Sequence, residues 1–214
     1  MPLADKSLNA QKFWGVEAQG FLYGNEYIFD PEQDQPLLAV IDSGTTLVML
    51  PYKVYDGLMM GIAKKVKDDP TVSFVCTREK GTGDIGACYF NNTRCEDITG
   101  KLEPMRFIFG GVVYEMQIQA FVKDVVDKGM LDGPPPPLKP GETYAGGCMF
   151  ELRPSKDRRE PDGSSEHRFL MGNTFLKNYV SVYDYDQQQV KLGVNIHSEK
   201  LAKAYPFKKG AFRT

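Results

Sequence analysis

The sequence predicts a domain built mainly of antiparallel β-strands with a few short helices, and three observations support this fold class. Short apolar runs, such as residues 37–41 and 105–109, recur between turn signals along most of the chain. The pair Gly110-Gly111 separates two such runs in the manner of a hairpin turn. One stretch, from Val54 to Val66, instead has apolar residues at the three- and four-residue steps of an amphipathic helix.

Length and composition exclude several classes of protein. The chain has 214 residues, of which 42% are hydrophobic, so it can bury a full core as one domain. The 26 basic and 28 acidic residues give a net charge of −2, which offers no positive surplus for a nucleic acid. The longest apolar runs are far shorter than the ~20 residues of a membrane-spanning helix, and residues 1–9 lack the apolar core of a signal peptide. We therefore expect neither a nucleic-acid partner nor a membrane span.

The first third of the chain reads as a hairpin, a buried strand and a helix. Residues 12–29 alternate loosely around a Gly24-Asn25 turn, which predicts the hairpin. The polar stretch 30–36 is a loop that leads into the buried strand 37–41. After Pro51, the helix has basic residues near its end and is closed by Asp69-Pro70.

The rest of the chain reads as short strands, two insertions and a tail. Strands at 72–75 and 87–90 flank a glycine-rich loop, and the hairpin 105–116 follows. The polyproline segment Pro134 to Pro137 and the polar stretch Arg153 to Glu166 are expected to be surface insertions. The stretch 167–194 predicts a strand, a short helix that opens after Gly172, and a hairpin around Asp186-Gln187. The basic, weakly patterned residues 198–214 are expected to be an extension or tag-like sequence with no assigned role.

The end of the buried strand carries the candidate chemistry. Asp42 follows the apolar run directly, and a carboxylate in such a place needs hydrogen-bond donors, because isolated buried charge is costly. The hydroxyls of Ser43, Thr45 and Thr46 and the amides around Gly44 are available as those donors. Such a turn suits a working carboxylate. Asp-Ser-Gly is also ordinary turn chemistry, and actin-like ATPases cradle phosphate with a similar loop, so the motif alone leaves these alternatives open.

The cysteines point to an oxidising compartment. Cys76, Cys88, Cys95 and Cys148 are even in number, and the glycosylation acceptor Asn91-Asn92-Thr93 lies among them. A zinc site is disfavoured because no pair has Cys-x-x-Cys spacing and the chain has two histidines, whereas free buried thiols remain an alternative. We expect no metal and no cofactor.

Four stretches, taken together and in order, carry a family resemblance: Trp14 to Gly24, Ala39 to Thr46 with Pro51 and Tyr55, Phe169 to Leu176, and Tyr179 to Val194. They resemble the C-terminal lobe of a pepsin-like aspartic protease. The resemblance implies an antiparallel lobe over residues 1–197, with residues 198–214 outside it. An actin-like ATPase would instead need a βαβ-rich domain and a second glycine-rich site, neither of which the sequence contains.

The resemblance also implies roles for the residues of the turn. Asp42 corresponds to a catalytic aspartate, Thr45 to the hydroxyl that bonds it, and Gly44 to an amide donor. Ser43 corresponds to the residue that grips the opposite lobe, and Thr46 to a substrate contact.

Elsewhere the resemblance implies that the segment through Gly172 crosses beside Asp42 and completes a ψ-shaped loop. Asn173 departs mildly from the aspartate that the family often has there. The implied disulfides are Cys95–Cys148 and Cys76–Cys88.

The mechanism implied by the resemblance needs a second carboxylate. Two aspartates share one proton in this chemistry, and the sequence has one Asp-Ser-Gly, no Asp-Thr-Gly and no identifiable flap hairpin. We therefore expect an aspartic endopeptidase half that acts on peptides or proteins together with a separate or cleaved N-terminal lobe, and that is inert alone. The alternative is a non-catalytic module that retains the lobe. The expected location is the secretory pathway, a lysosome-like compartment or the cell exterior, where the chain is a processed part of a longer precursor.

Overall fold

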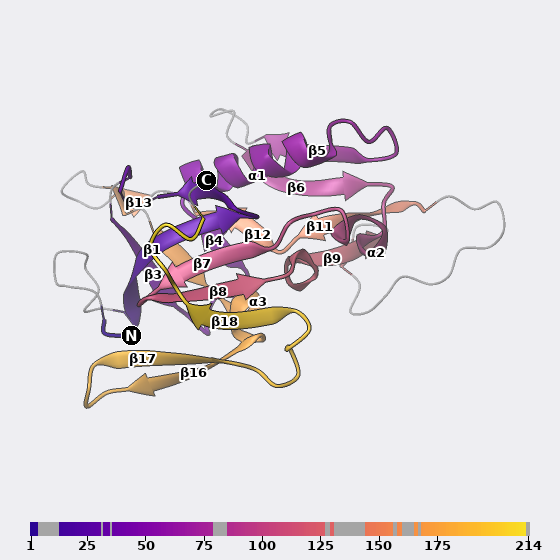
Figure 1. Ribbon diagram of the computed structural model, residues 1–214. Coiled ribbons are helices and arrows are strands. Elements are labelled where there is room, and N and C mark those ends of the chain that lie inside the picture. Colours follow the sequence, from indigo (N-terminus) through magenta and orange to yellow (C-terminus); the bar gives the residue numbers. More distant parts are fainter. Residues whose placement is uncertain are drawn as a thin grey trace.

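A computed structural model describes residues 1–3, 13–30, 32–34, 36–78, 85–126, 129–130, 144–155, 158–159, 165–166 and 168–212. In these parts of the chain, strands predominate and helices are few (Figure 1). The predicted fold class, mainly antiparallel β, is confirmed.

The largest sheet has nine strands within the described residues. Its order is β12-β4-β15-β3-β1-β7-β8-β18, with β2 paired to β1 beside this path. The strands are β1 (Gly15–Tyr23), β2 (Glu26–Phe29), β3 (Leu37–Ile41), β4 (Val48–Leu50), β7 (Met105–Phe109), β8 (Val112–Met116), β12 (Leu152–Pro154), β15 (Arg168–Met171) and β18 (Ala202–Pro206). All five residues of β3 are buried, as its unbroken apolar run predicts.

A second sheet has five strands in the order β10-β9-β11-β6-β5. These are β5 (Ser73–Arg78), β6 (Ile85–Asn91), β9 (Val122–Val126), β10 (Gly129–Met130) and β11 (Gly146–Phe150). Two hairpins stand apart from both sheets: β13 (Arg158–Arg159) with β14 (Ser165–Glu166), and β16 (Tyr179–Asp184) with β17 (Gln189–Val194). The helical elements are α1 (Tyr52–Val66), α2 (Cys95–Thr99), the 3-10 helix η3 (Ile118–Phe121) and α3 (Asn173–Leu176).

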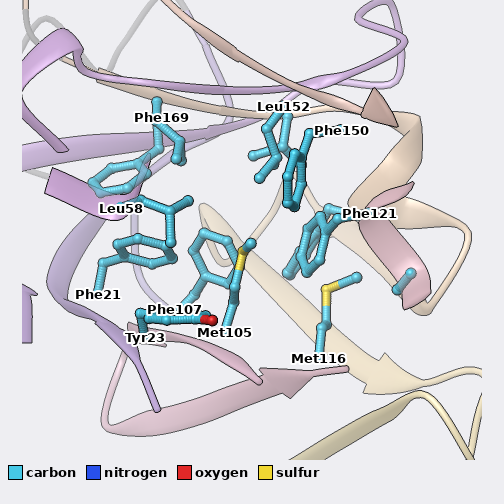
Figure 2. Packing of buried hydrophobic residues seen from close by; sticks show 14 of the residues in the cluster. Phe21, Tyr23, Leu58, Met105, Phe107, Met116, Phe121, Phe150, Leu152 and Phe169 are labelled. Atoms are coloured by element: carbon cyan, nitrogen blue, oxygen red, sulfur yellow. The ribbon is translucent and has the colours of Figure 1, made fainter. Parts of the chain in front are cut away.

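Phenylalanine rings fill the core between the two larger sheets and α1 (Figure 2). The Phe107 ring on β7 lies 4.8 Å from Phe21, 5.9 Å from Phe175 and 6.1 Å from Phe121, measured between centroids. Edge-on and tilted pairs at these distances add to the stabilisation that comes from burial itself. Helix α1 contributes the predicted face, because Val54, Leu58, Met59, Ile62 and Val66 are all buried.

The predicted hairpins are confirmed, and the turn between β7 and β8 shows why glycines are needed at positions 110 and 111. Strands β7 and β8 pair up to Phe109 and Val112, so Gly110 and Gly111 form the whole turn. Both have positive φ, 55° and 75°, which a two-residue hairpin turn requires and which side chains disfavour. The hairpins β1–β2 and β16–β17 are also present.

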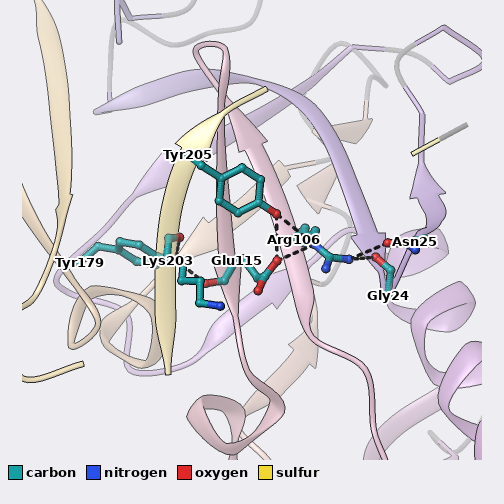
Figure 3. A network of polar contacts seen from close by, with 7 residues as sticks. All are labelled: Gly24, Asn25, Arg106, Glu115, Tyr179, Lys203 and Tyr205. Carbon is teal, nitrogen blue, oxygen red and sulfur yellow. Dashed lines mark hydrogen bonds and ion pairs between the residues drawn. The ribbon is translucent and has the colours of Figure 1, made fainter. Parts of the chain in front are cut away.

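The C-terminal tail differs from its prediction. Residues 198–214 were expected to lie outside the fold, yet β18 pairs along its whole length with β8 and extends the large sheet. Figure 3 shows the polar contacts that hold this edge strand: the Tyr205 hydroxyl donates to a Glu115 carboxylate oxygen at 2.9 Å, and Arg106 donates to the same oxygen at 2.8 Å. The strand shows a weak apolar pattern because Lys203 and Ala204 face solvent at the sheet edge.

The two expected insertions have different outcomes. Pro134 to Pro137 lie outside the described residues, as does most of the glycine-rich loop between β5 and β6. The stretch from Arg153 to Glu166 is not wholly an excursion, because its first residues belong to β12, which runs parallel to β4. Strand β12 is an edge strand of the large sheet, and its residues Arg153 and Pro154 are half-buried.

All four cysteines form disulfides, in the pairing that the resemblance implies. Cys76 and Cys88 lie directly opposite each other on β5 and β6, and Cys95 on α2 is joined to Cys148 on β11. No cysteine is free, which removes the thiol and zinc alternatives. Among the described helices, none combines the length and apolar character needed to span a lipid bilayer.

Candidate active site

The site is built where β15 passes between β3 and β4. Strand β15 runs parallel to β3, with Met171 opposite Ile41, and antiparallel to β4, with Met171 opposite Val48. Because β3 and β4 are the two arms of the excursion that contains Asp42, the inserted strand gives a ψ-shaped arrangement. A segment from late in the sequence therefore lies directly against the carboxylate turn.

Gly172, at the end of β15, makes this close approach sterically possible. A Cβ atom added there would lie 2.2 Å from the Leu47 carbonyl oxygen and 2.3 Å from that of Thr45. The φ of Gly172 is −83°, which any residue adopts, so space alone requires the glycine. Next to it, the Asn173 amide donates to the Thr45 carbonyl at 2.8 Å and the Asp42 amide donates to Met171 at 3.2 Å.

The Asp42 carboxylate receives one donor on each oxygen, and both come from its own turn. The Gly44 amide donates to Oδ1 at 2.8 Å, and the Thr45 hydroxyl donates to Oδ2 at 2.6 Å. Two donors on different oxygens fix the plane of the carboxylate. The side chain is half-buried at the surface of the lobe, which is a more open setting than the buried carboxylate that the sequence suggested.

The other two residues of the turn face solvent. Ser43 and Thr46 are both exposed, on either side of the Gly44-Thr45 pair. The Thr46 backbone is nevertheless held from behind, because its carbonyl accepts from the Thr174 amide at 3.0 Å and from the Thr174 hydroxyl at 3.2 Å. The roles expected for Ser43 and Thr46, toward another lobe and toward substrate, stay predictions.

Behind the turn lies a buried carboxylate that the sequence reading missed. Glu151, 4% exposed, is 3.1 Å from the Lys123 and Lys177 ammonium groups and 3.4 Å from the Thr174 hydroxyl. Its backbone carbonyl also accepts from the Val48 amide at 3.3 Å. Glu151 thus ties β4 and α3, the two elements on either side of the crossing. The sequence feature that could have pointed to Glu151 is its place as one acidic residue among apolar neighbours in Cys148 to Leu152.

The arrangement suits proton-transfer chemistry at a fixed carboxylate. Within the described residues, no group of three or more His, Cys, Asp or Glu side chains is placed to hold a metal ion. The structure presents one oriented carboxylate with a donor to each of its oxygens. Behind it, the Asn173 and Thr174 amides donate to carbonyl oxygens of the turn.

Comparisons with known proteins identify the family and the fold of the chain. The family model for eukaryotic aspartyl proteases matches residues 3–194. Among solved structures, the aspartic proteinase from Irpex lacteus is similar in fold, with a TM-score of 0.56 and 17% sequence identity. The match covers 93% of this chain and 47% of that one, so this chain spans about half the length of the Irpex lacteus proteinase. A comparison with curated protein sequences finds no match.

Proposed function

Because the chain belongs to the eukaryotic aspartyl protease family, we propose that it is the C-terminal lobe of a pepsin-like endopeptidase and that Asp42 is its one catalytic carboxylate. The observation that carries this proposal is the pair of hydrogen bonds, one to each oxygen of Asp42, within a turn held by the Gly172 crossing. A carboxylate whose plane is fixed in this way is oriented before a water molecule arrives.

In the proposed reaction, Asp42 and a second carboxylate share one proton. Two carboxylates this close cannot both ionise easily, so one remains charged while its neighbour stays protonated. The charged group removes a proton from water, the water oxygen attacks the peptide carbonyl carbon, and the protonated group donates to the carbonyl oxygen. The intermediate then breaks its C–N bond: the group that took the water proton gives it to the leaving nitrogen, and the other carboxylate takes a hydroxyl proton from the intermediate. The hydrogen bonds from Gly44 and Thr45 hold the Asp42 oxygens in a fixed orientation throughout these steps.

The second carboxylate is proposed to come from an N-terminal lobe on a separate or cleaved chain. This chain has one Asp-Ser-Gly turn and corresponds to about half of the Irpex lacteus proteinase. The β16–β17 hairpin also supports a partner lobe, because it stands apart from the larger sheets and exposes apolar side chains. Val180 and Val182, two residues apart on one face of β16, are 55% and 53% exposed, and Ile196 beyond β17 is 73% exposed.

Reconstitution tests the proposal directly. The chain is refolded alone and together with a separately produced N-terminal lobe that carries its own Asp-Thr-Gly turn, and peptide cleavage is measured at acid pH. We expect no cleavage by the chain alone, cleavage by the pair, and none by the pair that contains Asp42→Asn. Asp68→Asn, an exposed change of the same kind just after α1, is the matched control and should leave cleavage intact.

Two outcomes would count against the proposal. Cleavage that survives Asp42→Asn would remove this residue from the mechanism. A pair that associates and binds a pepstatin-type inhibitor but never cleaves peptides would favour the alternative, a non-catalytic module that retains the lobe.

The proposed location is the secretory pathway, a lysosome-like compartment or the cell exterior. Both disulfides support an oxidising environment, and the acceptor Asn91 is exposed at the end of β6. Expression behind a secretory leader, followed by thiol titration, should find no free thiol in the folded chain.

A further inference from the structure

The outer face of the five-stranded sheet places an aromatic ring beside the glycosylation acceptor. Tyr89 and Asn91 are two residues apart on β6, so their side chains lie on the same face, while Phe90 between them points into the core and is fully buried. Across the sheet, Asn91 is paired with Gly147 on β11 and Tyr89 with Met149. On the β11 side, the residue paired with Asn91 is therefore a glycine, which has no side chain.

The Tyr89 ring leans into that open position. A Cβ atom on Gly147 would lie 3.5 Å from Cδ2 of Tyr89, so the ring covers the glycine that is paired with Asn91. The Cδ2 edge of the ring therefore rests against the sheet at Gly147. Gly147 is itself buried, which fits this cover.

Asn91 and Tyr89 both line one hollow on this face, with a volume of about 560 Å³. Val125, Gly147 and Met149 supply apolar surface, and Asn92 supplies a polar rim. The described residues that line the hollow include no charged side chain. An uncharged ligand with one apolar face and polar edges matches this lining, whereas a phosphate or a charged peptide does not.

We propose that Asn91 carries an N-linked glycan and that its first N-acetylglucosamine packs on the Tyr89 ring in this hollow. The C–H bonds on one face of the sugar meet the electron-rich face of the ring, and the N-acetyl methyl group covers the neighbouring apolar surface. The sugar is uncharged, as the lining requires. Its attachment to Asn91 keeps it at the hollow, so little entropy is lost when it docks.

The attachment step balances with a dolichol-type oligosaccharide diphosphate as the donor. The Asn91 amide nitrogen forms a bond to the anomeric carbon of the first sugar, the bond from that carbon to the phosphate oxygen breaks, and the lipid diphosphate leaves. The amide nitrogen gives up one proton. Thr93 completes the Asn-x-Thr acceptor. The inference rests on the secretory route in the proposed function and is independent of catalysis by Asp42.

The test is a cycle of variants made behind a secretory leader in a glycosylating eukaryotic host. An endoglycosidase trims the glycan to one N-acetylglucosamine, and Asn91→Gln supplies the form without sugar. Both forms are prepared with Tyr89, Tyr89→Phe and Tyr89→Ala, and the thermal unfolding midpoint of each is measured. We expect the sugar to raise the midpoint by about 2 °C with Tyr89 or Tyr89→Phe and to have no effect with Tyr89→Ala.

The cycle compares two forms within each background, so any loss of stability caused by Tyr89→Ala alone cancels. Proton NMR of the trimmed protein should also place the signals of the sugar-ring C–H protons upfield with Tyr89 and return them to their free positions with Tyr89→Ala. Absence of sugar at Asn91 in the secreted, disulfide-bonded chain overturns the site. An equal gain in all three backgrounds overturns the packing on Tyr89. A failed protease assay would appear separately, in the reconstituted pair, and leaves this cycle unaffected.

Discussion

The substitution Gly172→Ala probes the crossing that holds the candidate catalytic turn. The added methyl group would meet two carbonyl oxygens, of Leu47 and Thr45, at 2.2 and 2.3 Å. These are backbone atoms of a paired region, so they cannot move aside as a flexible side chain does. We expect β15 and α3 to be displaced from the turn.

The magnitude follows from the contacts that the displacement breaks. The Asn173 and Thr174 amides donate to Thr45 and Thr46 at 2.8 and 3.0 Å, and each such bond contributes about 1 kcal/mol. Overpacking adds about 1–3 kcal/mol. The free energy of unfolding should therefore fall by about 4 kcal/mol, which lowers the unfolding midpoint of a chain of this size by about 12 °C.

The assay is urea and thermal unfolding of the oxidised chain, followed by circular dichroism. Gly100→Ala is the matched control, because an added Cβ there meets nothing within 4 Å and the backbone is helical, with φ −68° and ψ −14°. The control should be unchanged or more stable by up to about 1 kcal/mol. In Gly172→Ala alone, the amide NMR signals of Gly44 and Thr45 should shift. A loss below about 1 kcal/mol with those signals in place would refute the steric reasoning.

Three further predictions concern the turn, a disulfide and alkaline pH. Thr45→Val removes the donor 2.6 Å from Asp42 and should lower kcat/KM of the reconstituted enzyme by about 10- to 100-fold, while Thr45→Ser retains most activity. Serine at both Cys95 and Cys148 opens a loop with a sequence separation of 53 and should cost about 4 kcal/mol in urea unfolding; an unchanged midpoint would contradict this. Burial raises the pKa of Tyr55 to about 12 and also raises the pKa of Tyr179. Above pH ~10 the unfolded chain loses these protons first, so stability should be full below that pH and fall toward pH ~12, less steeply in Tyr55→Phe.

Local patterns were sufficient to predict most of the elements. The Gly110-Gly111 turn and the period of helix α1 depend on neighbours in the sequence, and both are present as expected. The crossing at Gly172 was anticipated through the family resemblance, because an apolar-apolar-Gly step alone does not say which strand it passes.

The features that the sequence did not predict share a physical cause: each depends on contacts with residues that are distant in the sequence. Glu151 is an ordinary acidic residue until the fold brings Lys123 and Lys177 to it from β9 and from the end of α3. Strand β18 looks like a polar tail, because its pairing with β8 uses backbone groups and one tyrosine hydroxyl, and neither leaves an apolar period.

The threading of β15 between β3 and β4 has a consequence for biosynthesis. The Thr46 carbonyl accepts a hydrogen bond from Thr174, which lies 128 residues further along the chain. This bond cannot form until most of the polypeptide has emerged from the ribosome. A truncated product that ends before β15 would carry the acidic residue on an untethered loop. The Asp42 turn therefore takes its final form late in synthesis, once β15 has been made.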